Sequence, residues 1–86
     1  MRFKLGKKYY RVKDDGGIYE FVAVKCIAKL DTENNNITYE YFDDGRLVIK
    51  DSDAYPENNI YGNADVAVNA AINLLNDKYN KANNGF

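Results

Sequence analysis

The alternation of apolar and polar positions along the chain predicts several short antiparallel strands followed by one helix. Residues 9–13, 37–42 and 47–50 read as short strands, and residues 60–61 can add another. Clusters of Asp, Asn and Gly separate these stretches, and such clusters are typical of tight hairpin turns. We therefore expect four or five short strands, most of them joined by hairpins.

Residues 18–30 form a longer run rich in Val, Ile, Phe and Tyr. This run exceeds the usual length of a strand and carries apolar side chains at both odd and even positions. A strand with two apolar faces can serve two sides of a core if a bend or a bulge interrupts it. We expect such a bend within this stretch.

Residues 63–80 have the spacing of an amphipathic helix. Asn63 can cap its first turn, and Asp65 lies where negative charge suits the helix dipole. The inner face is predicted to contain Ala64, Val68, Ala71, Ile72, Leu75 and Tyr79. The outer, solvated face is predicted to contain Asn69, Asn73, Asn76, Asp77 and Asn80.

These elements predict an α+β fold in which a small bent antiparallel sheet precedes one C-terminal helix. The sheet of four or five strands can be an SH3-like barrel or an open, curled sheet, and the helix would cover an edge or an end of it. A length of 86 residues allows one domain, residues 1–86, with one core.

Composition favours a cytoplasmic protein. No apolar run approaches the roughly 20 residues of a membrane helix. Residues 1–8 are basic but are not followed by the apolar run of a secretory signal. Cys26 is the only cysteine, which fits a reducing compartment.

The sequence does not predict an enzyme, a metal site or a cofactor. It contains no His, and Cys26 lies within an apolar stretch without an imidazole to activate it. Asp51 and Asp53 begin like a calcium-binding loop, but Pro56 and Gly62 stand where such a loop needs Gly and Glu. Binding is therefore a better expectation than catalysis.

Charge is unevenly distributed although the net charge is only −1. Residues 1–30 are strongly basic, and residues 31–65 are strongly acidic. Such a division either creates opposed surface potentials that steer partners, or the two segments pair in the fold and neutralise each other. Eight tyrosines leave a similar choice between a binding surface and aromatic pairing across strands.

Two alternative binding surfaces follow from this distribution. An acidic surface on a compact scaffold can occupy a basic groove built for nucleic-acid phosphates. The simpler interpretation of such acidic residues is a solvated loop without a partner. The acidic candidates, in two loops that we expect to be close in space, are Asp43, Asp44, Asp51, Asp53, Tyr55 and Glu57. The candidates for nucleic-acid binding, where phosphate contacts and base stacking would combine, are Lys4, Lys7, Lys8, Tyr10 and Arg11.

The order of motifs resembles that of small proteins from phages and mobile elements of Gram-positive bacteria. The motifs are Lys-Tyr-Tyr-Arg-Val at residues 8–12, Ile-Thr-Tyr-Glu-Tyr at residues 37–41, two Asp-Gly turns and an Ala-rich helix. In size, tyrosine content and acidity the chain is similar to phage-borne anti-CRISPR proteins. That resemblance implies a protein partner in the host cytosol, namely a nuclease whose nucleic-acid groove is occupied, but no residue role transfers by motif.

Three functions are therefore expected. The first is a non-enzymatic protein of a phage or mobile element that inhibits a host nucleoprotein, such as a CRISPR-Cas effector, by occluding its nucleic-acid groove. The second is a small nucleic-acid-binding β-barrel domain that uses the basic N-terminal segment. The third is an accessory structural phage protein.

Overall fold

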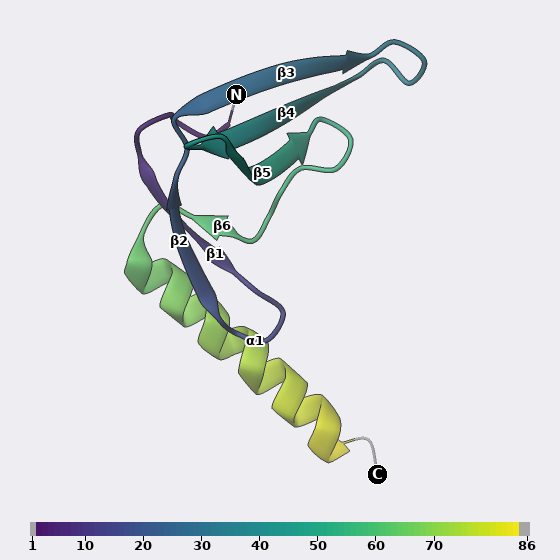
Figure 1. The fold of residues 1–86 in the computed structure, drawn as a ribbon. Coiled ribbons are helices and arrows are strands. Elements are labelled where there is room, and N and C mark those ends of the chain that lie inside the picture. Colours follow the sequence, from purple (N-terminus) through teal and green to yellow (C-terminus); the bar gives the residue numbers. More distant parts are fainter. Residues whose placement is uncertain (1, 85–86) are drawn as a thin grey trace. The chain divides into compact units, whose positions relative to one another are not determined.

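A computed structural model describes residues 2–84, with side chains described for residues 2–81. This part of the chain forms six strands and one helix (Figure 1). They are β1 (Lys8–Val12), β2 (Ile18–Val22), β3 (Lys25–Asp31), β4 (Asn36–Asp43), β5 (Arg46–Ser52), β6 (Ile60–Tyr61) and α1 (Ala64–Asn84). The strands make two three-stranded sheets with the orders β2-β1-β6 and β3-β4-β5.

The chain divides into two compact units, each built from two separate stretches. The first unit contains the residues up to Lys8 and Phe21–Asn58, and the second contains Tyr9–Glu20 and the residues from Asn59 onward. Because these stretches alternate, the division does not cut the sequence into two consecutive domains. One domain over residues 1–86 stays a prediction.

The first unit is built around the sheet β3-β4-β5, which consists of two antiparallel hairpins. The tight turn between β4 and β5 uses Gly45 at a φ of 83°, a conformation that glycine adopts without strain. The ring of Phe3 meets Tyr41 edge-on, with centroids 5.5 Å apart and planes at 84°. The buried apolar side chains of this unit are Phe3, Phe21, Ala23, Tyr41, Val48 and Ile49.

The second unit contains the sheet β2-β1-β6, except for Lys8 in β1 and the last two residues of β2, and the helix α1, which packs on β6. Asn63 caps the helix as expected, because its Oδ1 accepts a hydrogen bond of 2.8 Å from the backbone N–H of Asp65. The contact between helix and sheet is centred on the buried Val12, Ala67 and Ala71. Partly buried side chains surround this cluster, namely Tyr10, Tyr61, Ala70 and Leu74.

Of the predicted inner face of the helix, only Ala71 is buried. Val68, Ile72 and Leu75 are 45–49% exposed, and Tyr79 is 68% exposed. The helix instead approaches its sheet through alanines, whose small side chains permit close contact. The predicted outer residues Asn69, Asn73, Asn76, Asp77 and Asn80 are exposed.

The predicted α+β class with antiparallel strands and one C-terminal helix is confirmed. The long run of residues 18–30 is interrupted at Ala23 and Val24, so its two halves are separate strands of different sheets. Within residues 2–84 neither sheet closes on itself, which agrees with an open, curled sheet and not with an SH3-like barrel.

Candidate partner-binding loop

The candidate site lies in the first unit, in the loop that follows β5. Residues 53–58, here named the 53–58 loop, contain three of the predicted partner-binding residues, Asp53, Tyr55 and Glu57. A fourth, Asp51, lies near the end of β5. The backbone contacts of this segment decide how its side chains are presented.

Asp51 is buried, with 3% of its surface exposed, and its carboxylate holds the loop through hydrogen bonds. Its Oδ2 accepts a hydrogen bond of 3.1 Å from Arg2 Nε, and its Oδ1 accepts one of 2.6 Å from Arg2 Nη2. The same Oδ1 accepts a hydrogen bond of 2.6 Å from the backbone N–H of Glu57, whose carbonyl oxygen also accepts one from Arg2. Asp51 is therefore engaged within the fold and does not present its carboxylate to solvent. That it contacts a partner stays a prediction.

The pKa values of this pair reflect the network. Burial by itself would raise the pKa of Asp51, but the hydrogen bonds from Arg2 and Glu57 hold it below its usual value. The hydrogen bond to Asp51 raises the pKa of Arg2. The charged pair thus ties the N-terminal segment to the base of the loop.

Hydrogen bonds hold the backbone of the loop from residue 53 to residue 57. The N–H of Asp53 donates to the Ile37 carbonyl oxygen at 3.2 Å, and that of Ala54 donates to Asn36 Oδ1 at 3.1 Å. The N–H of Tyr55 donates to Ser52 Oγ at 2.9 Å. Pro56 has no N–H to satisfy, so each backbone donor from residue 53 to residue 57 has a partner.

This fixed backbone displays an aromatic side chain to solvent. Tyr55 is 84% exposed, the largest value among the exposed large hydrophobic residues of the described chain. Asp53 is exposed as well, and Glu57 is half-buried. Tyrosine on an ordered loop offers a large contact area at a low cost in conformational entropy.

Asp43 and Asp44 do not join this site. They precede β5, whereas the 53–58 loop follows it, and the seven residues of β5 separate the two groups by about 20 Å. Asp43 Oδ1 also lies 3.8 Å from Arg46 Nε in a local ion pair. The expectation that the two acidic loops are close in space is therefore wrong, because they occupy opposite ends of one strand.

The start of β4 is the actual neighbour of the loop, through the hydrogen bonds that join Asn36 to residue 54 and Ile37 to residue 53. The end of β3 and the turn that precedes β4 contain two acidic residues that the sequence analysis did not single out. Asp31 Oδ2 accepts a hydrogen bond of 2.8 Å from Asn34 Nδ2, which is the main reason why the pKa of Asp31 is lowered. Glu33 is exposed. The Asp-Thr-Glu sequence at residues 31–33 was a signal for an acidic turn, but its neighbour could not be read from local sequence.

The basic candidates are divided between the two units. Lys4, Lys7 and Lys8 belong to the first unit and are exposed. Tyr10 and Arg11 belong to the second unit and are half-buried. Tyr10 packs against the cluster under the helix, so part of its side chain is covered there, and its stacking on a base stays a prediction.

Two further observations concern residues 2–84 only. The described side chains contain no group of three acidic or Cys residues suited to a metal ion. The described helix is not long and apolar enough to span a membrane.

No family model, curated protein or solved structure matches the chain.

Proposed function

We propose that this protein is a non-enzymatic binding protein that acts through the 53–58 loop. The observation that carries the proposal is the exposed ring of Tyr55 on a backbone held by Asp51, Ser52 and Asn36. Aromatic anchors on preorganised segments dominate the binding energy of many protein interfaces. The carboxylates of Asp53 in the loop and of Glu33 in the β3–β4 turn, both exposed, would suit a basic partner.

The partner that we propose is a host nucleoprotein, such as a CRISPR-Cas effector, in the cytosol of a bacterium that carries a phage or mobile element. The loop would enter the basic groove that normally holds nucleic acid, where carboxylates take the place of phosphates. Tyr55 would supply apolar contact beside these charges. The function is inhibition by occlusion, which requires no catalytic group.

The test is an inhibition assay against a panel of purified CRISPR-Cas effectors, followed by measurement of affinity for any effector that is inhibited. Tyr55→Ala is expected to weaken binding by about 30-fold or more, the usual loss at an aromatic anchor. Asp53→Lys is expected to reduce the association rate and to weaken its dependence on salt.

Asp44→Lys is the matched control, because it makes the same charge change at the other end of β5. It is expected to leave the affinity unchanged within about twofold. Equal losses for Asp44→Lys and Asp53→Lys would show that only net charge matters and would contradict the assignment to this loop. A panel without inhibition would contradict the proposed partner class.

A further inference from the structure

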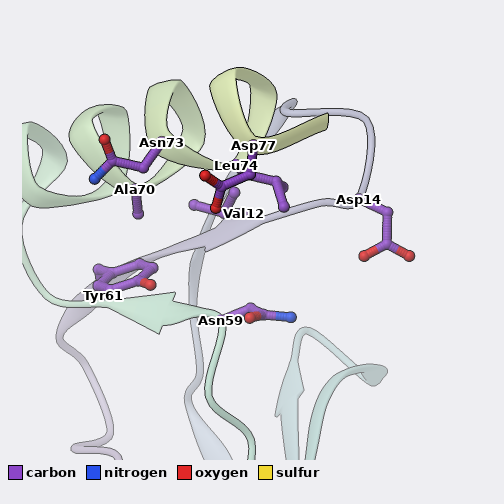
Figure 2. Close-up of a pocket in the computed structure, with 8 residues that line it drawn as sticks. All are labelled: Val12, Asp14, Asn59, Tyr61, Ala70, Asn73, Leu74 and Asp77. Carbon is purple, nitrogen blue, oxygen red and sulfur yellow. The ribbon is translucent and has the colours of Figure 1, made fainter. Parts of the chain in front are cut away.

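A cavity of about 360 Å³ lies in the second unit, between α1 and the strands β1 and β6 (Figure 2). Its apolar lining comes from both sides: Val12 and Tyr61 belong to the strands, and Ala70 and Leu74 belong to the helix. The short side chain of Ala70 leaves the helix unable to fill the space above Tyr61. The volume is at the lower end of the range for small-molecule sites.

The rim of this cavity is polar and acidic. Asn73 and Asp77 extend from the helix, Asn59 precedes β6, and Asp14 lies beyond the end of β1, farther from the other lining residues in Figure 2. No Lys or Arg is among the described residues that line the cavity. The nearest cation on the helix is Lys78, whose Nζ donates to the backbone carbonyl oxygen of Asp14.

We infer that this cavity binds a small organic cation, an ammonium or guanidinium group on a short apolar stem. The stem would lie on Leu74 and the ring of Tyr61, and this ring can also attract the cationic head. The carboxylate of Asp77 would accept hydrogen bonds from the head group in a charge-assisted pair. Charge complementarity selects this class, because the carboxylate of Asp77 would repel an anion and would find no charge-assisted partner in a neutral ligand.

The inference is independent of the proposed function, because the residues that line the cavity belong to the second unit and the 53–58 loop belongs to the first. None of the predicted site residues lines this cavity.

The experiment is a titration of the ¹⁵N-labelled protein, followed by the side-chain amide signals of Asn59 and Asn73 in NMR spectra. The probes are agmatine and 1,5-diaminopentane, with 1-pentanol and pentanoate as neutral and anionic controls of similar length. Both amines are expected to give saturable shifts at the two amides, at least tenfold tighter than the alcohol, whereas pentanoate gives none. Binding of the alcohol as tight as that of the amines would overturn the inference, and so would an absence of shifts with either amine.

Variants test the assignment of residues. Asp77→Asn is expected to weaken agmatine binding by about two- to fivefold, the usual worth of an exposed ion pair. Asp65→Asn is the control, because it removes the same charge from the first turn of the same helix, outside the cavity. An equal loss for Asp65→Asn would contradict a local site.

A second variant removes the cavity without removing charge. Ala70→Leu is expected to fill the space above Tyr61 and to abolish the shifts, and the remaining spectrum reports whether the fold is kept. Unchanged agmatine binding by a folded Ala70→Leu variant would overturn the inference. A blocked Gly-Arg-Gly peptide distinguishes the source of the cation: tighter binding of the peptide than of agmatine would indicate a basic side chain of a protein instead of a free amine.

Discussion

Asp51 and Asp53 are two positions apart and differ in role although both are aspartates. Asp51 is buried and accepts hydrogen bonds from Arg2 and Glu57, whereas the side chain of Asp53 is exposed. Both residues were predicted from the sequence as parts of a binding surface. Their difference depends on Arg2, which lies 49 positions away along the chain, and no local pattern reveals such a partner.

The structural role of Asp51 predicts a loss of stability on its substitution. Asp51→Asn is expected to lower the free energy of unfolding by about 1.5–3 kcal/mol, because the hydrogen bonds from Arg2 lose their charged acceptor. Asp53→Asn makes the same change on an exposed side chain and is expected to stay within about 0.5 kcal/mol of the wild type. Urea denaturation of both variants measures the difference, and equal midpoints for the two would contradict the role of Asp51.

The same carboxylate predicts a dependence on pH. The folded pKa of Asp51 is below its usual value, so its contribution is present above the unfolded pKa of about 3.9 and is lost as the pH falls through the folded pKa. The difference in unfolding free energy between the wild type and Asp51→Asn should therefore be full at pH 6 and should shrink below about pH 3.9. Urea denaturation at a series of pH values measures it, and a constant difference down to pH 2.5 would be inconsistent with an ionised Asp51 in the fold.

Among the elements, the helix shows the limit of periodicity as a guide to packing. Its position, its Asn63 cap and its polar outer face were predictable, because they depend on local sequence. Its buried face was not predictable. The helix α1 carries a stripe of large apolar residues beside a stripe of alanines, and the larger residues were predicted to be buried although the alanines are. The packed stripe is that of Ala67, Ala70, Ala71 and Leu74.

This register predicts which substitutions in α1 are costly. Ala67 is fully buried, so Ala67→Leu is expected to destabilise the fold by about 1–3 kcal/mol through overpacking. Leu75 is 46% exposed, so Leu75→Ala is expected to cost less than the 2–5 kcal/mol of a fully buried leucine.

Ala64→Leu is the control for the first variant, because Ala64 is exposed near the start of the same helix. It is expected to be neutral within about 0.5 kcal/mol. Thermal melts rank the stabilities of the three variants. A larger loss of stability for Leu75→Ala than for Ala67→Leu would support the inner face that the sequence predicted.

The turn between β1 and β2 predicts a steric effect that the turn between β4 and β5 lacks. Gly16 and Gly45 have nearly equal φ values, 84° and 83°. A Cβ at Gly16 would lie 2.8 Å from side-chain atoms of Leu75, whereas a Cβ at Gly45 would meet nothing within 4 Å. Gly45→Ala is therefore expected to cost about 1–2 kcal/mol for the left-handed backbone alone, and Gly16→Ala is expected to cost more.

The double variant Gly16→Ala with Leu75→Ala separates the two contributions. Removal of the leucine should relieve the contact and return the cost of Gly16→Ala to about that of Gly45→Ala. Unfolding free energies of the four variants measure this coupling. Additive losses of unfolding free energy would show that the side chain of Leu75 moves aside without strain.

For the whole molecule, the fold class was predictable and the division of the strands was not. The break at Ala23 and Val24 assigns residues 18–22 and 25–31 to separate sheets, and only long-range pairing determines that assignment. The uneven charge of the sequence is partly neutralised within the fold. Arg2 pairs with Asp51, and Lys29 Nζ lies 2.8 Å from Glu40 Oε1, so both pairs join the basic first third to the acidic middle.

The alternation of stretches between the two units has a consequence during synthesis on the ribosome. The hairpin of β1 and β2 emerges early, but β6 and α1, which complete its unit, follow about 40 residues later. The nascent chain therefore carries a hairpin whose apolar residues, among them Val12, have no helix to cover them while the other sheet is being translated. Apolar surface exposed in such an interval is prone to aggregation, and a pause in translation after Asn58 would lengthen this interval.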